Sequence, residues 1–265
     1  MLRSMYSGIS GMKNFQVKLD VIGNNIANVN TYGFKKGRTT FKDLVSQQIA
    51  GASEPGGTRG GVNPKQVGLG SQLATIDTVH TQGSLQTTGR PLDLGISGDG
   101  YFRLGSNTGT DITFTRAGNF YLDKTGSIVS ADGRFLLGDN EQPIVINTDA
   151  KSFSVGADGT VNYIDKDGKL IKAGQIELAK FANNEGLEKA GGNEYRLSAN
   201  SGDATPVLPG AGGAGTLVAG ALEMSNVDLS EEFTEMIVAQ RGFQANTRII
   251  TTSDEILQEL VNLKR

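Results

Sequence analysis

The two ends of the chain carry hydrophobic patterns typical of helices. Near the carboxyl end, apolar side chains recur every seven residues and would stack along one helix face. These residues are Leu229, Met236, Phe243, Ile250 and Leu257. Near the amino end, the same interval separates Met5, Met12, Leu19 and Ile26, and Ile9 and Ile22 lie between them. The pattern predicts one long helix at each end.

Both predicted helices have boundary signals. The first covers about residues 3–29 and ends near Asn28 and Gly33, because Asn and Gly tolerate left-handed backbone. The second covers 226–263, where Ser225 and Asp228 fit a Ser-x-x-Asp capping pattern. We therefore expect the two ends to form a terminal helical domain.

The predicted second helix is only half hydrophobic along its neighbouring line of residues. That line, four residues after each apolar position, contains Phe233, Gln240, Thr247, Asp254 and Val261. One such seam offers too little apolar burial to order two long helices. Our hypothesis is that both ends are largely disordered in the monomer and fold on assembly. Gly8, Gly11 and Gly242 are either tolerated helix defects or points of close helix approach.

The middle of the chain changes character twice. In residues 34–50, Phe41, Leu44, Val45 and Ile49 are spaced as in a short amphipathic helix, and the glycine-rich stretch 51–70 predicts a loop. From about residue 73, short alternating runs such as 101–104 are separated by Asp-Gly turn signals. This spacing is typical of antiparallel β structure.

Together these patterns predict a multi-domain α+β fold. We expect a coiled-coil domain formed by residues 1–33 and 226–265, a connector over 34–72, and an inserted antiparallel all-β domain over 73–225.

Composition excludes several classes of protein. The chain has 265 residues, of which 37% are hydrophobic, and it contains no cysteine, so disulfides and thiolate metal sites are absent. A net charge of −3 argues against nucleic acid as a main partner. The sequence contains no apolar run long enough for membrane insertion, and its start lacks the apolar core of a cleaved signal peptide.

Candidate catalytic residues are scarce. The only histidine, His80, is flanked by threonine and glutamine, and an ordinary strand or loop histidine is the simpler interpretation. No motif places a nucleophile, an acid–base pair or a phosphate loop. We expect a structural protein without enzymatic activity and without a cofactor.

Three blocks of sequence resemble the bacterial flagellar hook and rod protein family. The first extends from Ser7 through Asn24-Asn25-Ile26-Ala27-Asn28 to Gly33-Phe34-Lys35, and its most specific core is Asn-Asn-Ile-Ala-Asn. The second extends from Thr88-Gly89-Arg90 to Phe120, and the third covers Ser225 to Leu263 with Met236-Ile237-Val238-Ala239-Gln240-Arg241. The resemblance therefore spans both ends and the centre.

Within this family, the terminal blocks look more like a hook protein, whereas the length is closer to a distal-rod subunit. The resemblance implies a flexible hook polymer, a universal joint that transmits torque from rod to filament around the export channel. The alternative is a distal-rod (drive-shaft) subunit of the basal body. For the hook, our hypothesis is that the polar residues Gln240, Thr247 and Asp254 let helices shift, while the 51–70 connector lets the outer domain slide.

Membership of this family also implies partners and location. We expect a helical homopolymer in the flagellum outside the cell, in contact with the distal rod protein, hook cap and hook–filament junction proteins. Export would proceed through the flagellar type III apparatus. Phe41-x-x-x-Val45 resembles the export-recognition motif of these subunits, although such spacing can also serve ordinary packing. The candidate residues for packing between helices or subunits are Met5, Ile9, Met12, Leu19, Ile22, Ile26, Leu229, Phe233, Met236, Phe243, Ile250 and Leu257.

Overall fold

A computed structural model describes residues 2–56, 60–106 and 111–263 and divides the chain into two compact units. Unit 1 comprises Met1–Ala27, Gly37–Asp77 and Asp228–Arg265, and unit 2 comprises Asn28–Lys36 and Thr78–Val227. A helix lies near each end of the chain, and antiparallel strands fill the middle. The predicted α+β class is confirmed.

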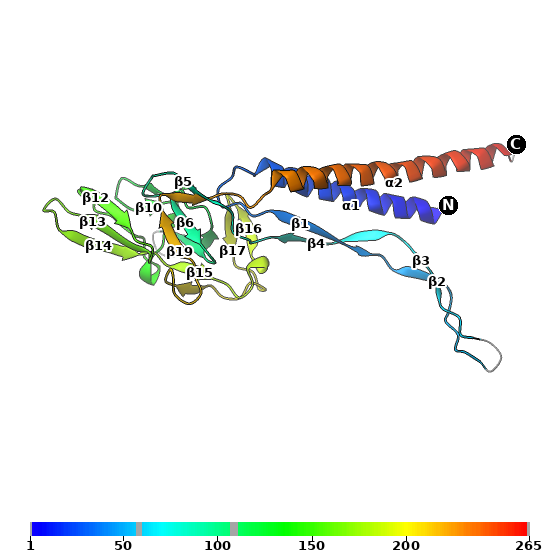
Figure 1. Cartoon of the computed structure of the whole chain (residues 1–265), viewed down its shortest axis with the longest axis horizontal. Helices are drawn as coiled ribbons and strands as arrows, with labels where there is room; N and C mark the ends of the chain where they lie inside the picture. The colour runs from blue at the N-terminus through cyan, green and yellow to red at the C-terminus, as the bar shows by residue number, and fades with distance from the viewer. Residues whose placement is uncertain (1, 57–59, 107–110, 264–265) are drawn as a thin grey trace. The chain divides into compact units, whose positions relative to one another are not determined.

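Unit 1 consists of two helices and a β-ribbon (Figure 1). Its elements are α1 (Leu2–Ala27), β1 (Gly37–Asp43), β2 (Ser46–Ala50), β3 (Lys65–Gly68), β4 (Ser71–Thr78) and α2 (Leu229–Leu263). Strand β1 pairs with β4 and β2 with β3, and the Leu44 N–H donates to Gly70 O at 2.9 Å between the two ladders. The four strands therefore form one long two-stranded ribbon.

Helix α2 begins three residues later than its predicted start. The Asp228 carboxylate accepts hydrogen bonds from the N–H groups of Ser230 at 2.8 Å and Glu231 at 3.4 Å. Asp228 is therefore the N-cap, and it satisfies two of the unpaired amides of the first turn. Ser225, predicted to cap the helix, instead accepts from the Val227 N–H.

The predicted short helix in residues 34–50 is wrong, because this segment forms β1 and β2. The run Thr39-Thr40-Phe41 contains β-branched and aromatic residues, which favour strands. Pairing with β4 then supplies the backbone hydrogen bonds, and Thr40 Oγ1 lies 2.6 Å from Thr75 Oγ1 across the ladder. The predicted loop 51–70 is also partly wrong, since β3 lies within it and Ser53 bridges to Val62; residues 57–59 lie outside the described residues.

Unit 2 is built from short strands and two 3₁₀ turns, Asp139–Glu141 and Asn184–Gly186. The strands are β5 (Leu85–Thr87), β6 (Leu94–Ser97), β7 (Tyr101–Gly105), β8 (Thr113–Thr115), β9 (Tyr121–Leu122), β10 (Ile128–Val129), β11 (Phe135–Leu136), β12 (Ser152–Val155), β13 (Thr160–Ile164), β14 (Leu170–Gln175), β15 (Leu178–Lys180), β16 (Glu188–Gly191), β17 (Glu194–Arg196), β18 (Thr205–Val207), β19 (Thr216–Ala219) and β20 (Ala221–Glu223).

Strand β7 lies at the centre of the largest sheet, whose order is β16-β17-β8-β7-β11-β10-β9. It pairs with β8 on one side and with β11 and β15 at successive positions on the other. All five of its residues are buried, as expected for a central strand. This strand matches the run predicted over 101–104.

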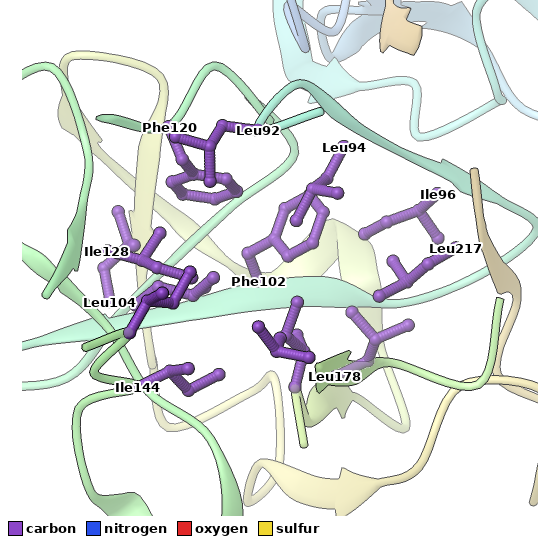
Figure 2. Packing of buried hydrophobic residues seen from close by; sticks show 14 of the residues in the cluster. Leu92, Leu94, Ile96, Phe102, Leu104, Phe120, Ile128, Ile144, Leu178 and Leu217 are labelled. Atoms are coloured by element: carbon purple, nitrogen blue, oxygen red, sulfur yellow. The ribbon is translucent and has the colours of Figure 1, made fainter. Parts of the chain in front are cut away.

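The main hydrophobic core of unit 2 is continuous and closely packed (Figure 2). Phe102 and Phe120 meet edge to face at 5.1 Å, a favourable arrangement for aromatic rings. Leu94, Ile96 and Leu217 close the core where β6 pairs with β19. A smaller aromatic cluster around Tyr101, Phe181 and Tyr195 packs separately.

Candidate assembly surface

The buried and half-buried residues of α2 follow two lines along the helix. Along the predicted line, Met236, Phe243, Ile250 and Leu257 are half-buried. The second line lies three residues after each residue of the predicted line from Leu229 to Ile250. It contains Glu232, Ala239, Asn246 and Ser253. Three of these four are buried: Glu232, Ala239 and Ser253. Together the two lines have the alternating three- and four-residue spacing of a heptad pattern. The second line was not predicted, because its residues are small or polar and the prediction used apolar positions.

Glycines bring the two helices close together. A Cβ atom on Gly242 would lie 2.5 Å from Cζ of Phe15, and one on Gly8 would lie 3.4 Å from Cγ1 of Ile250. A Cβ on Gly11 would lie 3.0 Å from the Asn246 amide. Of the two interpretations left open by the sequence, the structure favours close helix approach at these three positions.

Asn25 joins α1 to both α2 and β1. Its Nδ2 donates to Gly37 O at 2.9 Å and to the Glu232 carboxylate at 3.1 Å, while its Oδ1 accepts from the Gly37 N–H at 2.9 Å. Asn25 and Glu232 are both buried, so each of these bonds replaces water that the groups have lost. The second asparagine of the Asn-Asn-Ile-Ala-Asn block thus has a structural role.

Helix α1 also packs on the β-ribbon. Phe15 and Phe41 lie with ring centroids 6.4 Å apart, and Asn14 Nδ2 donates to Ser71 Oγ at 2.8 Å. Ile22 is buried, whereas Met5, Met12, Leu19 and Ile26 are half-buried and Ile9 is exposed. The predicted α1 residues therefore lie on more than one side of the helix.

Many large apolar side chains are exposed among the described residues of unit 1. On α2 the exposed large apolar residues are Leu229, Phe233, Ile237, Val238, Ile249, Ile256, Leu260, Val261 and Leu263. On the ribbon they are Phe41, Val45, Ile49, Val62, Val67, Leu69 and Ile76. Large exposed apolar patches are typical of surfaces that contact other proteins, so these residues are candidates for contacts with other subunits. We call these residues the assembly surface.

The candidate export residues fall on the ribbon rather than on a helix. Phe41 lies in β1 and is partly shielded by Phe15, whereas Val45 lies between β1 and β2 with 80% of its surface exposed. The two side chains therefore do not share a helical face, which was the packing alternative drawn from their spacing.

Chemical sites of other kinds are not evident in the part of the chain that the structure describes. Across residues 2–56, 60–106 and 111–263, no three His, Asp or Glu side chains gather in a way that could hold a metal ion. Neither described helix is apolar enough over a sufficient length to cross a membrane. His80 lies in unit 2, where its Nδ1 is 2.7 Å from the hydroxyl of Tyr101.

Three family models match the chain in succession. They are described as a flagellar basal body rod protein (residues 5–35), a flagellar hook protein FlgE/F/G D1 domain (95–163) and a flagellar basal body rod FlgEFG protein C-terminal region (218–263). The first and last cover most of α1 and α2, and the middle one covers the centre of unit 2.

Curated relatives align over the whole chain. The flagellar basal-body rod protein FlgG of Bacillus subtilis is 65% identical over 266 residues and is covered completely. The corresponding rod protein of Borreliella burgdorferi is 37% identical over 271 residues. The flagellar hook protein FlgE of the same organism is 33% identical, but its alignment extends over 443 residues. This chain therefore belongs to the flagellar hook and basal-body rod protein family, and it is a structural subunit of the flagellum.

Proposed function

We propose that this chain is a subunit of the flagellar rod, in its distal part, rather than of the hook. The observation that carries the proposal is length. The alignments with rod relatives extend over 266 to 271 residues and need no long insertion in either chain. Those with hook relatives extend over 443 and 465 residues, so the hook proteins carry long segments that this chain lacks.

The terminal blocks that favoured a hook do not discriminate between the two subunits. Both hook and rod relatives align over the full chain, so both contain counterparts of the helical ends. We therefore prefer the distal-rod (drive-shaft) subunit to the hook (universal-joint) subunit.

The ribbon also supports a rigid polymer. The hook hypothesis used 51–70 as a loose connector that permits sliding, but within this stretch β3 pairs with the preceding strand β2, and Ser53 bridges to Val62. At its base the ribbon is tied to α1 through Asn25 and Asn14. A hydrogen-bonded ribbon bends less readily than a glycine-rich loop, which suits a straight shaft.

In this proposal the helices of successive copies form an inner tube around the export channel. The assembly surface is covered by further copies, with coiled-coil packing between α1 and α2 as the seam. Phe233 is half exposed in the single chain and is the clearest candidate for a contact between subunits. Leu229 and Ile9 are exposed too and would contact other copies, whereas the remaining predicted packing residues, which are buried or half-buried, would contribute contacts within the subunit.

The proposed partners change accordingly. Hook subunits would attach at one end of the polymer, and the hook cap and hook–filament junction proteins would not be direct neighbours. Export through the flagellar type III apparatus remains part of the proposal. The exposed Val45 side chain is accessible for recognition during export.

Electron microscopy of basal bodies tests the assignment. A strain lacking this chain should produce basal bodies with a shortened rod and no hook, and expression of the chain should restore both. As a matched control, the same strain should be complemented with a hook protein, which should not restore the rod. A rod of normal length that ends without a hook would show that the chain forms the hook.

A further inference from the structure

Unit 2 is joined to the rest of the chain through three segments, 28–36, 78–84 and 221–227. The side chain of Asn226, in the third segment, binds the other two. Its Oδ1 accepts from the Lys36 N–H at 2.8 Å, and its Nδ2 donates to Val79 O at 2.8 Å. Lys35 Nζ adds a bond to Thr81 O at 2.8 Å. Side-chain hydrogen bonds therefore connect the three segments.

A buried ion cluster lies at the same place. Lys35 Nζ is 2.6 Å from one Glu223 oxygen, and Arg116 Nη1 is 3.3 Å from the other. The Gly83 N–H donates to the Glu223 carboxylate at 3.0 Å, so this side chain also holds the second segment. We call Lys35, Arg116, Glu223 and Asn226 the clasp.

The clasp carries more positive than negative charge. Two buried cations, Lys35 and Arg116, share one buried carboxylate, and within the described residues Arg116 Nε has no hydrogen-bond partner. An uncompensated charge away from water is costly, and a further positive charge nearby would raise that cost steeply.

His80 is the group that can add such a charge. Its Nδ1 is bound to the Tyr101 hydroxyl, while its Nε2 is buried and, among the described residues, has no partner. Its ring also meets Tyr195 edge to face at 5.6 Å. The ionisable groups around it are Tyr101 on β7, Tyr195 on β17, Lys189 on β16, Glu223 on β20, and Lys35, Asp99 and Arg116 on connecting segments.

We propose that the clasp is an acid-sensitive latch, which holds the three segments together only while His80 is neutral. Protonation gives the imidazole a second N–H that must be satisfied and a positive charge facing Lys35, Arg116 and Lys189. Glu223 cannot neutralise it, because both of its oxygens already serve the two buried cations. The ring must then leave its site, and segment 78–84 leaves with it.

The direction of the pH dependence follows from the site. Burial, and then the charges of Lys35, Arg116 and Lys189, lower the pKa of His80 from 6.5 to about 4. Burial raises the pKa of Tyr101 to about 12, so its hydroxyl stays protonated. The unfolded chain therefore binds a proton at His80 more tightly than the folded chain does. Stability from this residue is complete above pH 6.5 and is lost as the pH falls from 6.5 toward 4.

The full-length protein can be tested directly, because it contains a single histidine. Labelling with ¹³C-histidine gives one Cε1–H signal whose titration reports the His80 pKa. Hydrogen exchange at the same pH values should show protection of 33–36, 79–83 and 221–223 falling up to about tenfold per pH unit between 6.5 and 4. Strands β13 and β14 provide the internal reference for intrinsic exchange.

Two variants separate the latch from general acid sensitivity. In His80→Asn, and in His80→Phe if the first does not fold, the three segments should lose no more protection than the reference strands. A titration midpoint near 6.5 in the wild type would overturn the proposal. Equal acid loss of protection in the wild type and the folded variant would overturn it as well.

Discussion

The two units bury very different kinds of side chain. In unit 2 the core contains large apolar residues such as Phe102, Leu104 and Phe120, each almost fully removed from water. In the described part of unit 1, the buried apolar residues are Ile22 and Ala239, beside buried polar residues such as Asn25 and Glu232. Unit 2 can therefore obtain its stability from its own core. Unit 1 positions its elements by hydrogen bonds and glycine contacts, and leaves many of its large apolar side chains exposed.

The largest expected effect is a difference in monomer stability between two variants, each of which replaces one phenylalanine by alanine in one of the two units. Phe102→Ala should lower the free energy of unfolding of unit 2 by about 3–5 kcal/mol, since it leaves a cavity in the main core. Phe233→Ala, at a half-exposed site on α2, should change monomer stability by about 0.5 kcal/mol or less yet impair polymerisation. Urea unfolding followed by near-UV circular dichroism measures the first effect. Equal loss of monomer stability in both variants would contradict the comparison.

The next effect concerns the bonds that connect the elements of unit 1. Asn25→Asp removes a donor and places a second carboxylate beside Glu232, which should destabilise the assembled state by about 1–3 kcal/mol. The critical concentration for polymerisation should then rise roughly 5- to 150-fold. Adding Glu232→Gln to this variant should recover part of the loss, because it restores one donor and removes the like charge. Unaltered polymerisation of Asn25→Asp would exclude this role of Asn25.

A smaller effect should have opposite signs in monomer and polymer. Gly242→Ala should raise the helicity of the lone chain, because alanine favours a helix over glycine by about 1 kcal/mol. When α1 and α2 pack together, the added Cβ would overlap Phe15, so polymerisation should weaken. Gly23→Ala is the matched control, since no atom outside its own turn lies within 4 Å of its added Cβ. Circular dichroism measures the helicity of the monomer, and sedimentation measures polymerisation. Improved polymerisation of both variants would contradict this prediction.

The smallest structural effect is expected at the ribbon. Val45→Ser changes a side chain with 80% of its surface exposed, so monomer stability should shift by about 0.5 kcal/mol or less. If Val45 belongs to the export signal, the amount of secreted subunit should nevertheless fall. Val62→Ser, at an exposed position on the same ribbon, should leave secretion unchanged. Equal secretion of both variants would remove Val45 from the signal.

The sequence predicted the elements with strong periodicity better than those that depend on distant partners. The two terminal helices and strand β7 follow from repeated apolar positions and turn signals. The ribbon was missed because the spacing of Phe41 and Val45 fits a helix, whereas pairing with β4, some thirty residues away, decides for strand.

The assembly surface was predicted unevenly for a similar reason. Apolar seven-residue spacing identified Met236, Phe243 and Ile250, but the partner line contains Glu232, Ala239 and Ser253, whose burial depends on how closely α1 approaches. The role of Asn25 required the positions of Gly37 and Glu232, which no local pattern reveals.

Hydrogen exchange on dilute, monomeric, full-length protein tests the central claim most directly. We predict strong protection in the core strands of unit 2, especially 101–105, together with near-complete exchange in 2–27 and 229–263 until subunits polymerise. Protection of both helices in the monomer equal to that of unit 2 would contradict it.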